Sequence, residues 1–103
     1  MKINIDYKRD KNSQDKATNQ ELTADYINFA VRSFYKEGLD SQWRRTFARI
    51  QRKLDEAIDT KADEVDFEQA ELDFIQRAVK EAKYPPELSK YVVIFEDELD
   101  KIK

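Results

Sequence analysis

Glycine and proline occupy only three positions of this 103-residue chain, namely Gly38, Pro85 and Pro86. Both residue types interrupt helices, and β-sandwiches or barrels need many turn residues of this kind. The stretches between them are rich in Glu, Lys, Arg, Gln and Ala, which favour helix. The chain is therefore predicted to be mainly α-helical, with helices ending close to Gly38 and to Pro85.

Hydrophobic spacing locates these helices. Over residues 41–58 the apolar side chains step by four, three, four and three positions, which indicates one helix with a continuous core-facing stripe. A preceding helix is predicted from about Glu21 to Glu37, with Gly38 following it because glycine tolerates a positive φ. A third helix is predicted to begin at Asp66, whose spacing to Gln69 resembles a capping box.

The two ends of the chain carry other patterns. Residues 1–7 alternate apolar and polar side chains and predict a short strand, whereas residues 8–20 lack large apolar residues and predict a mobile polar linker. Residues 64–67 also alternate and could pair with the first strand. Residues 88–95 could form a strand or a helix, and the apolar spacing of the whole last segment favours helix.

These elements predict one domain over residues 1–103, because a chain of this length supplies a single core. Its helical body covers residues 21–103. The expected fold is mainly α, a compact bundle of three or four helices with a short N-terminal β-strand or minor hairpin.

The composition excludes several kinds of site. Cysteine and histidine are absent, so disulfides, Cys/His zinc sites and catalytic Cys–His or Ser–His–Asp sets cannot form. The single glycine, Gly38, cannot build a phosphate-cradling loop, so no cofactor and no metal are expected. No apolar run is long enough for a membrane span, and a signal-peptide core is missing, so a cytoplasmic protein without membrane contact is expected.

Five cations crowd the segment QWRRTFARIQRKL, residues 42–54. On a helical projection Arg45, Arg49 and Arg52 lie opposite the apolar stripe, with Lys53 beside them. This edge could be a solvated or internally paired face, a contact for an acidic protein, or a track for nucleic-acid phosphates. Because the aromatic residues fall on the core side, base stacking beside the arginines is not expected.

Carboxylates form two further candidate sites. Glu71 falls on the apolar face of the third helix, where a charge is costly unless paired. It is predicted to be a structural carboxylate, either buried and paired with an arginine of the second helix or placed at the rim of the bundle. A general acid or base is the alternative, and without histidine no enzyme activity is expected. The run Glu96-Asp97-Glu98-Asp100 is interpreted as a solvated acidic tail or docking surface, since its spacing does not suit a metal.

Apolar residues also extend beyond the expected stripes. Those of the first helix span more than one face, so that helix is either central or in contact with another chain. A possible oligomer interface therefore comprises Ile27, Val31, Phe34, Val93 and Ile94. Residues 1–58 hold 12 Lys/Arg and 9 Asp/Glu, a balance of +3, while residues 59–103 hold 7 and 13, a balance of −6. This asymmetry could attract the halves of two chains to each other.

The small size, the opening MKINIDYKRD and the segment EVDFEQAELDFIQRAVKEAKYPPELSKYVVIFEDELDKI resemble a small accessory protein of a tailed bacteriophage. The resemblance implies a protein of the host cytoplasm that binds host or phage proteins as an inhibitor, an anti-defence factor or an assembly helper. The leading hypothesis is accordingly a non-enzymatic protein-interaction module that forms a homo-oligomer. The alternatives are a nucleic-acid binder that uses Arg45, Arg49 and Arg52, or an acidic DNA mimic.

Overall fold

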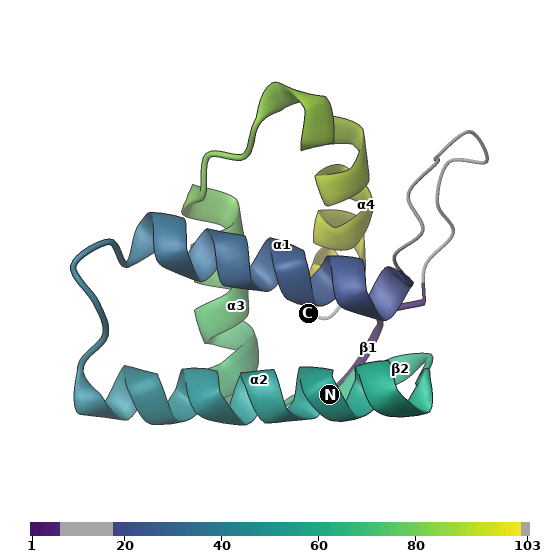
Figure 1. The fold of residues 1–103 in the computed structure, drawn as a ribbon, viewed down its shortest axis with the longest axis horizontal. Coiled ribbons are helices and arrows are strands. Elements are labelled where there is room, and N and C mark those ends of the chain that lie inside the picture. The colour runs from purple at the N-terminus through teal and green to yellow at the C-terminus, as the bar shows by residue number, and fades with distance from the viewer. Residues whose placement is uncertain (7–17, 102–103) are drawn as a thin grey trace.

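The computed structural model of the protein describes residues 1–6 and 18–101 (Figure 1). The predicted mainly helical fold with a short N-terminal β-strand is confirmed, and this strand belongs to a two-stranded antiparallel sheet. The elements are β1 (Lys2–Asn4), α1 (Asn19–Phe34), α2 (Ser41–Thr60), β2 (Glu64–Asp66), α3 (Gln69–Glu81), the 3-10 turn η1 (Pro86–Leu88) and α4 (Ser89–Asp100). Most of the predicted linker, residues 8–17, lies outside the described residues, and its last two residues already belong to α1.

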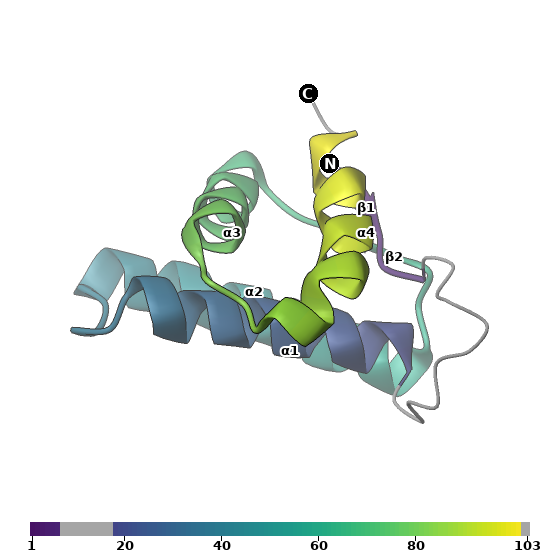
Figure 2. The same cartoon turned by 90° about the horizontal axis from the view of Figure 1, so that it is seen from above.

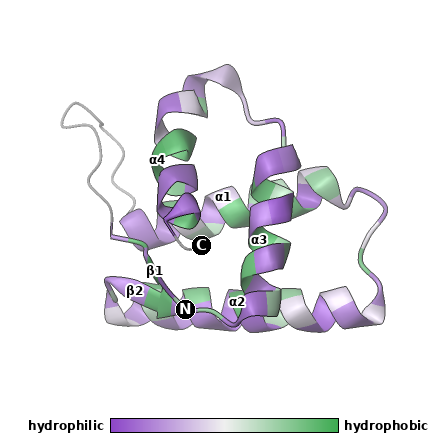
Figure 3. Ribbon diagram, turned by 180° about the vertical axis from the view of Figure 1, so that it is seen from behind, coloured by the Kyte–Doolittle hydropathy of each residue, from purple (hydrophilic) through white to green (hydrophobic). Residues whose placement is uncertain are grey.

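The helices form two layers. Figure 1 shows α1 and α2 running antiparallel, with α3 and α4 crossing α1 steeply. Figure 2 shows α3 and α4 side by side on one side of the α1–α2 layer. Hydrophobic residues gather where the helices face one another, and hydrophilic residues cover much of the outward side of α2 (Figure 3). The central position of α1 explains its wide apolar surface, since α1 packs against both α2 and α3.

The two strands form an antiparallel pair, as their alternating patterns indicated. Ile3 lies opposite Val65, and both side chains are buried. The Phe67 N–H donates to the Met1 carbonyl at 2.9 Å, and the Ile5 N–H donates to the Asp63 carbonyl at 2.9 Å. The strand pair thus ties the N-terminal segment to the connection between α2 and α3.

Residues 88–95 adopt the helical alternative. Val92, Phe95 and Leu99 of α4 are buried at spacings of three and four, and this packing outweighs the strand preference of the β-branched residues. Among the helices of the described ranges, none has the length and apolar composition required to cross a bilayer.

The ends of the helices differ from the prediction in two places. Helix α1 ends at Phe34, three residues before Glu37, and the chain then turns through a hydrogen bond from the Gly38 N–H to the Tyr35 carbonyl. Helix α3 begins after a capping box of Glu68 and Glu71, because Asp66 is held in strand β2. Local spacing alone placed both signals within a few residues of their true positions.

Gly38 is expected to be required for the connection between α1 and α2. Its φ is +100°, a conformation that residues with a Cβ rarely adopt, although no atom would obstruct an added Cβ. We expect Gly38→Ala to lower the free energy of unfolding by about 1–2 kcal/mol through backbone strain alone. Denaturant unfolding would measure this loss. An unchanged or higher stability would mean that the turn relaxes to negative φ without cost.

Candidate functional site: the basic edge of helix α2

Helix α2 presents one edge of positive charge to solvent. We call Arg45, Arg49, Arg52 and Lys53 the basic edge. The Asp40 carboxylate caps the helix by accepting the Trp43 N–H at 3.0 Å. The opposite face is fixed in the core by four buried residues, Thr46, Ile50, Leu54 and Ala57. The three arginines consequently project outward, on the side that the helical projection predicted.

The inner part of the basic edge holds a buried carboxylate. Glu71 of α3 is 0 % exposed, and its Oε1 accepts from Lys53 Nζ at 2.6 Å and from the Glu68 backbone N–H at 2.8 Å. Arg49 Nε lies 3.9 Å from Glu71 Oε2, too far for a hydrogen bond. The main partner is therefore a lysine, and the expected arginine contributes only a longer electrostatic contact. The lysine side chain is long and flexible. Its Nζ therefore reaches Glu71 and also donates to the Asp66 carbonyl at 3.0 Å.

The outer part of the basic edge is unpaired. Arg45 and Arg52 are exposed, and neither forms an ion pair with any residue in the described ranges. Arg49 stands four positions from Arg45 and three from Arg52, so like charges neighbour each other along the helix. Each such pair destabilises a helix by about 0.2–0.5 kcal/mol. The like charges along this edge therefore lower the stability of α2.

The aromatic residues of α2 face away from these arginines. The rings of Trp43 and Phe47 lie 5.4 and 5.9 Å from the ring of Phe74, measured between centroids. Tyr35 stacks on the same Phe74 ring at 5.3 Å, and burial raises the pKa of its hydroxyl. The rings therefore form one cluster around Phe74, and the aromatic side chains of α2 provide no stacking platform among its exposed arginines.

The predicted oligomer interface needs correction. Ile27 and Val31 are 1 % and 3 % exposed, so the core of the same chain covers them. Phe34 and Ile94 are half-buried, and the Arg77 guanidinium lies 5.7 Å from the centre of the Phe34 ring. Val93 is 50 % exposed and is the part of this set that remains on the surface. A broad apolar contact with a second chain is not available at these residues.

The acidic run on α4 is a second charged surface, which we call the acidic end: Glu96, Asp97, Glu98 and Asp100. Glu98 and Asp100 pair with Lys101 and Lys80 at 2.9 and 3.3 Å. Burial raises the pKa of Glu96, and the negative charges of Asp100 and Asp97 raise it further. The carboxylates are thus crowded. Within the described residues no group of three or more acidic side chains could hold a metal ion.

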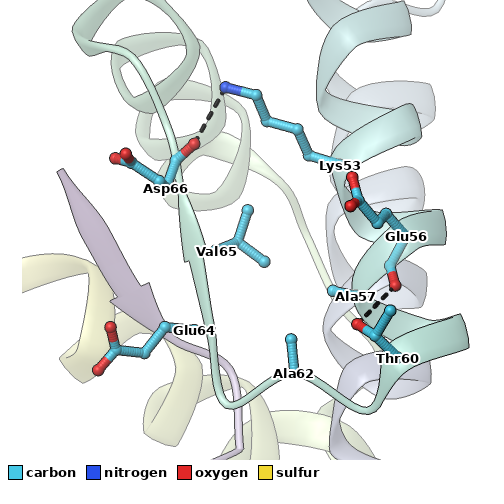
Figure 4. A pocket seen from close by; sticks show the side chains of 8 residues that line it. All are labelled: Lys53, Glu56, Ala57, Thr60, Ala62, Glu64, Val65 and Asp66. Carbon is cyan, nitrogen blue, oxygen red and sulfur yellow. Dashed lines mark hydrogen bonds between the residues drawn. The ribbon is translucent and has the colours of Figure 1, made fainter.

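A hollow of about 300 Å³ lies between α2 and β2 (Figure 4). Its floor contains Ala57, Ala62 and Val65, and Lys53 closes one side through its bond to the Asp66 carbonyl. Glu71 does not line it. The remaining lining residues are polar: Glu56, Thr60, Glu64 and Asp66. The hollow therefore has a small apolar floor, a largely acidic rim and one ammonium group that already has two acceptors.

Comparisons of the chain with protein-family models, with curated proteins and with solved structures give no match.

Proposed function

We propose that this protein is a small accessory protein-interaction module that binds a carboxylate-rich protein surface through the basic edge of α2. The observation that carries the proposal is that one part of this edge is paired within the chain and the other part is not. Lys53 and Arg49 surround an internal carboxylate, while Arg45 and Arg52 are exposed and have no ion-pair partner among the described residues.

The spacing of the two outer arginines suits such a partner. Residues seven positions apart lie on the same side of a helix, about 10 Å apart along its axis. Each guanidinium can form two parallel hydrogen bonds to one carboxylate, which gives orientation as well as attraction. A partner that carries two acidic side chains at a similar distance could engage Arg45 and Arg52 together.

The orientation of the aromatic rings favours carboxylates over nucleic-acid phosphates. Trp43 and Phe47 are turned toward Phe74, so bases would find no aromatic ring to stack on beside the arginines. Nucleic-acid binding by the same edge is the competing proposal.

The test compares two polyanions. A fluorescent polyglutamate peptide and an oligonucleotide of similar length would be titrated with the protein at low salt, with anisotropy as the measurement. We expect tighter binding of polyglutamate, and we expect Arg45→Glu/Arg52→Glu to weaken it by about tenfold or more. The matched control is Lys36→Glu/Lys83→Glu, which changes the net charge equally at exposed positions outside α2.

Two results would overturn the proposal. Tighter binding of the oligonucleotide would assign the edge to phosphates. An equal loss in the edge variant and in the control would show that overall charge, and not this edge, governs binding. Circular dichroism of each variant would confirm that the helices are retained.

A further inference from the structure

We infer that the basic edge of α2 is a docking surface for a second copy of this chain, whose acidic end of α4 supplies the carboxylates. The inference rests on the proposed function and names the partner. Its argument is charge complementarity between two surfaces that lie on different helices of the same molecule.

Each surface is unfavourable by itself. Along the basic edge, Arg49 neighbours Arg45, Arg52 and Lys53 at helical spacings of three and four, and Glu71 offsets part of this repulsion. In the acidic end, Asp100 stands four positions from Glu96 and three from Asp97. These carboxylates also lie at the C-terminus of α4, where the helix dipole disfavours negative charge, and the last turn contains no basic residue. Contact between the two surfaces would reduce the like-charge repulsion within each of them.

The two surfaces are not paired with each other in the part of the chain that the structure describes. In both Figure 1 and Figure 2 the end of α4 lies apart from the first half of α2, which carries Arg45 and Arg49, and α3 stands between them. No ion pair within the described ranges joins α2 to α4. The acidic end uses Lys80 and Lys101 locally, and exposed Asp97 forms no ion pair with a described residue. A complementary contact therefore requires two molecules.

The contact would be electrostatic and head-to-tail. Met1 and Val93 are the large hydrophobic side chains that stand exposed in the part of the chain that the structure describes, so little apolar area is available to be buried. Joining α2 of one copy to α4 of the next leaves a basic edge and an acidic end free, which permits growth beyond a dimer. We expect the average mass to rise with concentration at low ionic strength and to fall at about 1 M salt, where charges are screened beyond about 3 Å.

A charge-swap experiment tests the pairing. One variant, Arg45→Glu/Arg52→Glu, carries acidic groups on both surfaces, and another, Asp97→Lys/Asp100→Lys, carries basic groups on both. We expect each variant alone to be monomeric by sedimentation at several hundred micromolar and low salt. Their equimolar mixture is expected to associate, because each surface again meets its opposite charge. The matched controls move no charge on either surface: Lys36→Glu/Lys83→Glu and Glu64→Lys/Glu81→Lys.

The outcomes separate this inference from the proposed function. A wild-type chain that stays monomeric, variants that associate as the wild type does, or a mixture that stays monomeric would each overturn the inference. Polyglutamate binding by the basic edge would then still support an acidic partner of another kind. Arg45 and Arg52 are exposed, and Asp97→Lys/Asp100→Lys places positive charge in the last turn of α4, where the helix dipole favours it. Both variants are therefore expected to fold, and thermal unfolding checks this.

Discussion

Replacing Phe74 by alanine is expected to lower the free energy of unfolding by about 3–5 kcal/mol. The Phe74 ring is 1 % exposed and forms the centre of a cluster with Tyr35, Trp43 and Phe47. These rings come from α2 and from the residue that follows α1, while Phe74 itself belongs to α3. Alanine would leave a cavity where three helices meet, and the surrounding rings cannot all collapse into it.

Urea unfolding followed by circular dichroism and by the fluorescence of Trp43 would measure the loss. The fluorescence reports on the cluster directly, because the centroids of the Trp43 and Phe74 rings are 5.4 Å apart. The control is Val93→Ala, a truncation of an exposed side chain that should change stability by no more than about 0.5 kcal/mol. If Phe74→Ala costs no more than this control, the ring cluster does not belong to the folding core.

The elements that the sequence predicted correctly are those with a strong period of their own. The stripe from Trp43 to Ala57 specifies α2 with almost no reference to its surroundings. The alternation in residues 1–7 and 64–67 predicts two strands. They pair because each strand alone would leave its backbone N–H and C=O groups without partners. For α4, the strand propensity of its β-branched residues and the helical spacing of its apolar residues gave opposite predictions. The spacing was correct, because Val92, Phe95 and Leu99 are buried in the core.

The questions that the sequence left open concern interactions that depend on tertiary packing. The wide apolar surface of α1 fitted either a central helix or an interface, and only the position of α1 against α2 and α3 decides for the core. Likewise, the helical projection placed the basic edge on the correct side of α2. It could not show which of the four cations pair with a carboxylate of the same chain and which stay exposed. Whether an arginine or Lys53 meets Glu71 depends on where α3 crosses α2 and on how far each side chain reaches.

The second large effect is expected at this crossing. We expect Lys53→Met to lower the free energy of unfolding by about 3–5 kcal/mol, because it leaves the buried Glu71 carboxyl group without its main ion-pair partner. Lys53 Nζ is 2.6 Å from Glu71 Oε1, whereas Arg49 Nε is 3.9 Å from Oε2. Arg49→Met should therefore cost less than half as much. Arg52→Met, on the same helix but without a described ion-pair partner, should stay within about 0.5 kcal/mol of the wild type.

The double variant Lys53→Met/Glu71→Leu separates the cost of an unpaired charge from a general loss of packing. Apolar residues that replace both members of a buried ion pair are often neutral or stabilising. Glu71 also accepts the Glu68 N–H at the start of α3, and losing this cap costs about 1 kcal/mol. We therefore expect the double variant to recover most of the stability lost in Lys53→Met, but not all of it. Denaturant unfolding of the four variants decides the matter, and a double variant no more stable than Lys53→Met would refute the assignment of Glu71 as a buried partner of Lys53.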